Sequence, residues 1–242
     1  MDSLHFELKE NLQEFNFKTL ELDYLDIVKQ KINFISKSEK VKDVIKENYI
    51  ISEDKKNLTS NNYSIFECDL SNIKTLENTI AKSNLCKSDL TIIVAECLLC
   101  YLESTDIINL LKFFNEYFEN VVLVYYDLIH FDDVFGKVMI NNLKNIRGII
   151  LPSFQETKSE NDQLERMKKS GFNFYNKCVD MLDYYMNILD KKELKRINSL
   201  EFVDEVEEFN LLMKHSCLGV SIKIKDENIK ENLSFLIDYN IR

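Results

Sequence analysis

Four short runs of apolar and β-branched residues, separated by stretches with helical periodicity, constrain the fold of this chain more than any other feature. The runs are FKTLELD (17–23), YSIFECD (63–69), LTIIVAE (90–96) and NVVLVYYD (120–127). Nearly continuous apolar runs of this length are typical of parallel strands covered by helices on both faces. The alternation of strand and helix therefore predicts an α/β fold with a Rossmann-like, doubly wound and mostly parallel sheet.

Helical patterns fill the intervals between these runs. LDIVKQKINFI follows the first run, Ser71 is placed to cap IKTLENTIAKS, and Ser104 or Thr105 is placed to cap DIINLLKFFNEYF. In the second half, Gly148 is expected to end a helix, and Thr157 with Glu160 fits a capping box. Two further strands, GFNFYNKCV (171–179) and CLGVSIKIK (217–225), are expected to form an antiparallel pair at a sheet edge. No linker or internal repeat interrupts the pattern, which predicts one domain over 1–242.

Charge and hydropathy exclude several classes of protein. The chain has 31 basic and 41 acidic residues, a formal charge of −10, which disfavours a nucleic-acid partner. No apolar run reaches the roughly 18 residues of a membrane-spanning helix, and the polar first twenty residues do not read as a secretory signal. Six cysteines without a zinc-binding pattern indicate reduced, buried thiols and a cytoplasmic location.

Acidic residues follow three of the predicted core strands. Asp23, Asp69 and Glu96 each stand at the carboxyl end of a run, where open parallel sheets bind ligands. Such carboxylates could accept hydrogen bonds from ribose hydroxyls and an adenine amino group, and Glu96 could face a cationic group. The alternatives are helix capping and a magnesium site. A glycine-rich phosphate loop is absent from the first half, since Gly136 is the first glycine, so no metal site is predicted there.

Three segments carry a resemblance to a known family. They are TIIVAECLLCYLESTDIINLLKFF, YYDLIHFDDVFGKVMINNL and RINSLEFVDEVEEFNLLMKHSCL. Their E-C-x-L-x-Y core, F-G-x-[VI]-M-I-x-N-L helix and S-L-E-F-[VL]-D-E helix resemble the leucine carboxyl methyltransferases, from about Met1 to Lys223. The resemblance implies a class I methyltransferase fold and methyl transfer from S-adenosylmethionine to the C-terminal leucine carboxylate of the protein phosphatase 2A catalytic subunit.

The family pattern also suggests roles for particular residues. It implies that Asp23 contacts the ribose of S-adenosylmethionine, that Asp69 and Leu70 lie at its adenine end, and that Glu96 is a further cofactor contact. Tyr101 would position the substrate over the reaction site. The start departs from the family: Met1-Asp2-Ser3 resembles the end of a G-x-G-M-D loop. We therefore expect the first strand, the glycine loop and the N-terminal helical segment to be missing.

The implied chemistry needs no general base. A terminal carboxylate, with an unperturbed pKa near ~3.5, is already ionised at neutral pH, so the three histidines are expected to be structural. Two other functions stay open: a non-catalytic or truncated relative that acts as a binding module, and a small-molecule O-methyltransferase. A tRNA-modifying relative is disfavoured by the charge. The oligomeric state is not predicted.

Overall fold

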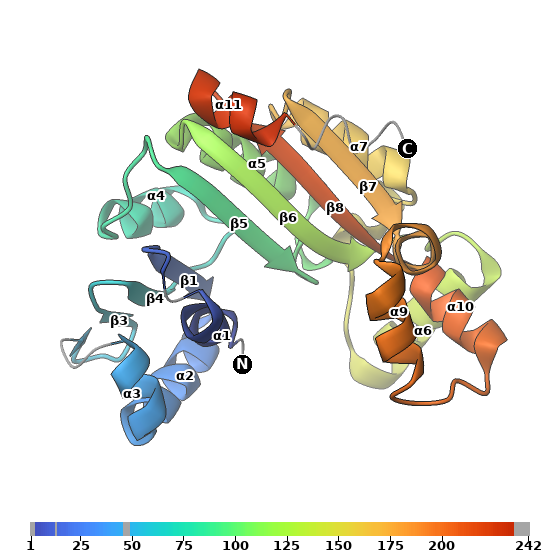
Figure 1. Ribbon diagram of the computed structural model, residues 1–242, viewed down its shortest axis with the longest axis horizontal. Coiled ribbons are helices and arrows are strands. Elements are labelled where there is room, and N and C mark those ends of the chain that lie inside the picture. The colour runs from blue at the N-terminus through green and yellow to red at the C-terminus, as the bar shows by residue number, and fades with distance from the viewer. Residues whose placement is uncertain (1–2, 13, 46–48, 235–242) are drawn as a thin grey trace. The chain divides into compact units, whose positions relative to one another are not determined.

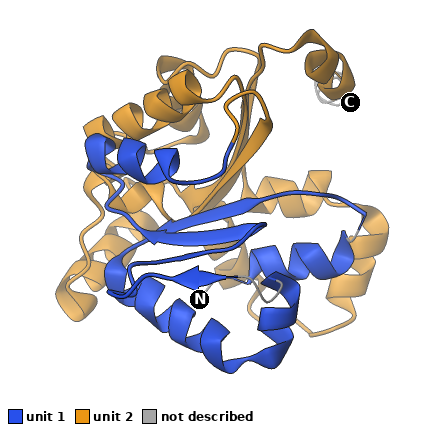
Figure 2. Ribbon diagram, turned by 90° about the vertical axis from the view of Figure 1, so that its left-hand side faces the viewer, with its two compact units in different colours: residues 1–85 blue, residues 86–242 orange. Residues whose placement is uncertain are grey.

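The computed structural model describes residues 3–12, 14–45 and 49–234, which divide into two compact units, residues 1–85 and 86–242 (Figure 2). Each unit combines helices with its own four-stranded mixed sheet, which confirms the α/β class. The single domain expected over 1–242 stays a prediction. Met1 and Asp2, the first two residues of the loop-like start, lie outside the described residues.

The first unit contains four helices and four strands (Figure 1): α1 (Leu4–Asn11), β1 (Thr19–Asp23), α2 (Leu25–Lys37), α3 (Glu39–Ile45), β2 (Ile50–Ile51), β3 (Asn57–Thr59), β4 (Tyr63–Glu67) and α4 (Ile73–Ala81). Its strand order is β1-β4-β3-β2, and only the β1–β4 pair is parallel. The predicted first and second strands are therefore present and adjacent. The β2–β3 hairpin was not predicted, because its strands are too short to show a clear period.

The core of the first unit follows from one helical stripe. Val28, Ile32 and Ile35 recur at helical spacing on α2 and are buried. They belong to one apolar cluster with Tyr63 and Ile65, which alternate along β4 and face the same side of the sheet. The amphipathic α2 is thus held on the sheet by burial of its apolar face.

His5 of α1 is buried in this unit, as expected for a structural histidine. It is 1% exposed, and its Nδ1 lies 2.8 Å from the Thr19 hydroxyl. Burial, helped by the nearby charges of Lys9 and Lys31, lowers the pKa of His5 to about 4.

Protonation of His5 is expected to make the first unit less stable in acid. The pKa of His5 is lower in the folded protein than its unfolded value of about 6.5. The contribution of neutral His5 to the free energy of unfolding is therefore complete above pH ~6.5 and is lost as the pH falls toward 4. The loss is expected to reach about 2 kcal/mol. Urea unfolding of the protein and His5→Gln from pH 7 to pH 4 measures it. Parallel pH profiles for the two proteins would contradict this prediction.

The second unit holds the remaining elements: β5 (Leu90–Glu96), η1 (Leu99–Tyr101), α5 (Ser104–Tyr117), β6 (Asn120–Leu128), α6 (Val134–Arg147), η2 (Pro152–Gln155), α7 (Glu160–Lys169), β7 (Tyr175–Asp180), α8 (Met181–Asp183), η3 (Tyr184–Ile188), α9 (Lys191–Asn198), α10 (Val206–Lys214), β8 (Ser216–Lys223) and α11 (Glu227–Leu233). The strand order is β5-β6-β8-β7 (Figure 1). The β5–β6 pair is parallel, and β8 is antiparallel to both β6 and β7. The predicted antiparallel pair is confirmed.

One close contact and one helix end in this unit depend on glycine. A Cβ atom on Gly136 would lie 2.4 Å from the His130 carbonyl oxygen and 2.6 Å from the Phe131 Cα. Glycine thus lets the first turn of α6 approach the preceding backbone, which explains the glycine of FGKVMINNL. Gly148 ends α6 at φ 66°, as the sequence predicted.

Several local predictions are wrong. Asn72, not Ser71, caps α4, and Ser159 with Asp162, not Thr157 with Glu160, forms the capping box of α7. Neighbouring polar residues compete for the same helix end, so sequence alone places a cap only to within a residue or two. SLEFVDE (199–205) lies between α9 and α10 and is not helical; its Phe202 is 86% exposed, so no burial stabilises a helix there.

Burial along β5 also differs from the expectation of a strand covered on both faces. β5 lies at the edge of its sheet, and Leu90, Ile92 and Val94 alternate as exposed residues on one face.

Within the described residues, no helix has the length and apolar character needed to cross a membrane.

Candidate functional site

The E-C-x-L-x-Y segment forms the tip of β5 and the turn that follows it. Glu96 is the last residue of the strand, and the next residue, Cys97, adopts φ 45° while its N–H donates to the Tyr126 carbonyl at 2.8 Å. The chain then enters the short helix η1, which buries Cys100 and leaves Tyr101 49% exposed. The carboxylate between two apolar runs therefore marks the point where the chain leaves the sheet.

Glu96 and Tyr101 both present functional groups to solvent at this tip. Within the described ranges, the Glu96 carboxylate makes no hydrogen bond or ion pair, so its oxygens are available to a ligand. Burial, together with the neighbouring Cys100, Cys97 and Asp127, raises the pKa of the Tyr101 phenol. The hydroxyl therefore stays protonated at neutral pH and can donate a hydrogen bond.

Asp127 lies at the end of β6, beside β5, and sequence reasoning missed it. It is 1% exposed, and burial raises the pKa of its carboxyl group despite a hydrogen bond from Leu128 N at 3.0 Å. The Cys100 thiol is hydrogen-bonded to it, and burial raises the pKa of that thiol. The protonated thiol can therefore donate. The signal was available, since Asp127 ends the fourth apolar run just as Glu96 ends the third.

Arg166 of α7 supplies a positive charge that interacts with this buried carboxylate. It is 6% exposed, and burial lowers the pKa of its guanidinium although Asp127 attracts the charge. Its Nη1 donates to Gln163 Oε1 at 3.4 Å, and its Nη2 has no partner in the part of the chain that the structure describes.

In the first unit, Asp23 and Asp69 lie at the same edge of the sheet. β1 and β4 are parallel with Asp23 opposite Glu67, and Asp69 follows two residues later. Asp23 accepts from Tyr24 N at 2.7 Å, and Asp69 accepts from the Ser71 N–H and hydroxyl at 3.0 and 2.7 Å. Each contact engages only Oδ1, so each residue can both hold its turn and offer a second oxygen.

The structure thus places the predicted residues at strand ends within their own units. Leu70 follows Asp69 and is half-buried. The predicted roles of these residues in one cofactor pocket stay predictions. All six cysteines are free; Cys86 is exposed and Cys97 half-buried, so the expectation of buried thiols is wrong for these two.

The fold defines a class of protein. A putative methyltransferase from Thermobifida fusca shares it with a TM-score of 0.51 at 11% identity, over 86% of this chain and 64% of that one. The chain therefore shares the α/β fold of that methyltransferase, and its described residues form mixed sheets.

Sequence comparison shows which known proteins this chain is similar to. Residues 1–115 match the sequence model of leucine carboxyl methyltransferase. The chain is 33% identical over 221 residues to leucine carboxyl methyltransferase 1 of Rattus norvegicus, covering 90% of this chain and 65% of that protein. It is 31% identical over 225 residues to the Arabidopsis thaliana homolog, covering 91% and 66%. The chain is therefore similar to the leucine carboxyl methyltransferases, and it spans less than two thirds of either relative's length.

Proposed function

We propose that this chain binds S-adenosylmethionine and methylates the C-terminal leucine carboxylate of a protein, with the tail of a protein phosphatase 2A catalytic subunit as substrate. Similarity to the leucine carboxyl methyltransferases supports the reaction class. The observation that carries the proposal is the β5 tip, where Glu96 and Tyr101 present an acceptor and a donor on the family's motif. A cytoplasmic location is part of the same proposal.

The residues at the strand ends fit this cofactor chemically. Carboxylate oxygens at the ends of β1 and β4 suit ribose hydroxyls and an adenine amino group, and Asp23 and Asp69 each have an oxygen outside their turn contacts. The exposed Glu96 carboxylate would favour the cationic end of the ligand. When bound, the cofactor supplies an electrophilic methyl group on a sulfonium.

The protein's contribution is then position rather than proton transfer. The attacking carboxylate is ionised without a base, and the Tyr101 hydroxyl, protonated at neutral pH, can donate to it and orient it. Alignment of reacting groups accounts for up to ~7–11 kcal/mol of barrier in favourable cases. This role fits a tyrosine that ends η1, close after the β5 tip, and is 49% exposed.

Calorimetric titration with S-adenosylhomocysteine tests the cofactor contacts. The parent is expected to bind in the micromolar range, and Asp69→Ala and Glu96→Ala to weaken binding by about tenfold or more, because each removes an anionic acceptor. Asp89→Ala is the matched control, since Asp89 is an exposed carboxylate just before the opposite end of β5. A folded parent that gives no heat would support the binding-module alternative.

The same preparations distinguish the substrates. Methyl transfer to a peptide ending in leucine, with no transfer to its C-terminal amide, would support the proposal. Tyr101→Phe is expected to reduce that transfer by about tenfold, equivalent to ~1.4 kcal/mol, with S-adenosylhomocysteine affinity unchanged. Transfer to small hydroxylated compounds and not to the peptide would favour the O-methyltransferase alternative.

A further inference from the structure

Three potential metal ligands meet at one edge of the second unit, away from the β5 tip in sequence. β6 and β7 both run antiparallel to β8, so β6 and β7 end on the same side of the sheet, beside the start of β8. His130 follows the end of β6, and Asp180 is the last residue of β7. Glu160 begins α7, the helix that leads into β7 and packs against it. Three elements thus deliver one imidazole and two carboxylates to the same place.

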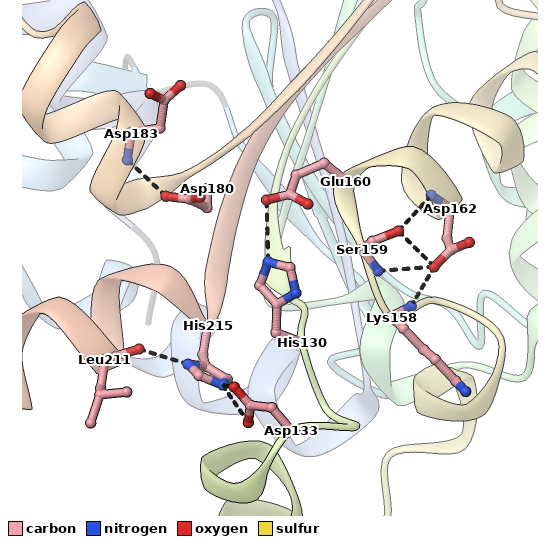
Figure 3. A network of polar contacts seen from close by, with 10 residues as sticks. All are labelled: His130, Asp133, Lys158, Ser159, Glu160, Asp162, Asp180, Asp183, Leu211 and His215. Atoms are coloured by element: carbon pink, nitrogen blue, oxygen red, sulfur yellow. Dashed lines mark hydrogen bonds and ion pairs between the residues drawn. The ribbon is translucent and has the colours of Figure 1, made fainter.

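The donor atoms are close enough for a single ion. One ligand atom from each of His130, Glu160 and Asp180 lies within 4.8 Å of the other two. The His130 Nε2 and Glu160 Oε1 are 3.3 Å apart, close to the roughly 3.4 Å between two ligands of a tetrahedral ion with bonds near 2.1 Å. In Figure 3 these two side chains point toward each other, and Asp180 lies at the end of β7.

The charge of the cluster is not balanced by the protein. No lysine or arginine in the described ranges forms an ion pair with Glu160 or Asp180. Lys158 is the lysine nearest to Glu160 in the sequence, and its side chain points away from the three donor groups (Figure 3). Two half-buried carboxylates therefore share a single imidazole, and a divalent cation would neutralise them.

The ligands are already held by contacts outside the cluster. The His130 N–H donates to the Lys158 carbonyl at 2.7 Å, which ties the loop after β6 to the segment just before α7. The Asp180 Oδ1 accepts from Asp183 N at 2.7 Å, which orients the carboxylate and leaves its second oxygen for an ion. Such supporting hydrogen bonds are what orient metal ligands in known sites.

We propose that His130, Glu160 and Asp180 bind one divalent transition-metal ion of the zinc class, which links β6, α7 and β7. Magnesium and calcium are excluded as preferred ions because they take oxygen ligands, whereas an imidazole nitrogen suits zinc and its neighbours. Three protein ligands leave a further position for water. The site departs from the expectation of no metal, and it does not depend on the proposed methyl transfer.

The test is calorimetric titration of the full chain with ZnCl2, in a Cys86→Ser background that removes the exposed thiol. One ion per chain is expected to bind in the micromolar range, with MgCl2 far weaker. His130→Asn, Glu160→Gln and Asp180→Asn are each expected to weaken zinc binding by about tenfold or more. Asparagine is chosen because residue 130 has φ 60°, which asparagine tolerates.

Matched controls separate the site from general charge effects. Glu165→Gln changes an exposed carboxylate on the same helix, and Asp183→Asn keeps the backbone N–H that holds Asp180. Both are expected to bind zinc as the parent does, and circular dichroism checks the fold of every variant. A cobalt(II) spectrum without a thiolate charge-transfer band would confirm nitrogen and oxygen ligation. Zinc binding that is absent, or equal in Glu160→Gln and Glu165→Gln, would overturn the proposal.

Discussion

Gly219→Ala is expected to destabilise the second unit by about 3 kcal/mol, the upper end of the usual cost of overpacking a core. Gly219 of β8 lies opposite Tyr125 of β6, whose ring covers it. An added Cβ would lie 2.0 Å from the Tyr125 Cζ and 2.3 Å from its hydroxyl oxygen. Tyr125 is fully buried, so its ring cannot move aside without displacing the surrounding core.

Hydrogen exchange in peptides from β6 and β8, with denaturant unfolding, measures this cost. Gly148→Ala is the control: its φ of 66° strains an alanine, but no atom lies within 4 Å of the added Cβ. Gly148→Ala is expected to lower the free energy of unfolding by about 1 kcal/mol. Combining Gly219→Ala with Tyr125→Leu should cost less than the sum of the two changes, because the smaller side chain makes room. Strict additivity would show that the clash is not the cause.

Lys31→Met is expected to destabilise the first unit by about 3 kcal/mol, because it removes the ammonium that forms an ion pair with a mostly buried carboxylate. The Lys31 ammonium forms an ion pair with Glu21 of β1, and their side chains are 4% and 16% exposed. Methionine retains most of the volume of the lysine stem, so the change isolates the charge. The expected loss is near the lower end for buried pairs because Glu21 keeps some contact with water.

Denaturant unfolding of three variants tests this explanation. Lys40→Met removes the ammonium that pairs with Glu10; the two side chains are 80% and 51% exposed, so no measurable change in the free energy of unfolding is expected. Lys31→Met with Glu21→Gln should recover part of the stability, since the uncompensated charge is gone. If the double variant is no more stable than Lys31→Met alone, lost packing and not charge is responsible.

The sequence alone determined the features that depend on neighbouring residues. Apolar runs predicted β1, β4, β5 and β6, because a short run of consecutive apolar and β-branched residues is typical of a strand. Gly148 predicted the end of α6, because the left-handed backbone conformation that ends many helices is most easily adopted by glycine. The same local pattern located Glu96 at a strand tip. The motifs on these elements depend on residue type and spacing alone, and they are specific enough to indicate the family that the chain resembles.

Only the tertiary structure decided which distant residues meet. The distribution of strands between two mixed sheets depends on hydrogen bonds between segments far apart in the chain, which periodicity does not encode. The Asp127–Cys100 contact and the His130–Glu160–Asp180 cluster arise in the same way. Burial raised the pKa of Asp127 because the fold removed it from water, whereas Glu96, also an acidic residue at a strand end, remained exposed. Residue type and local position were similar, and the surrounding packing made the difference.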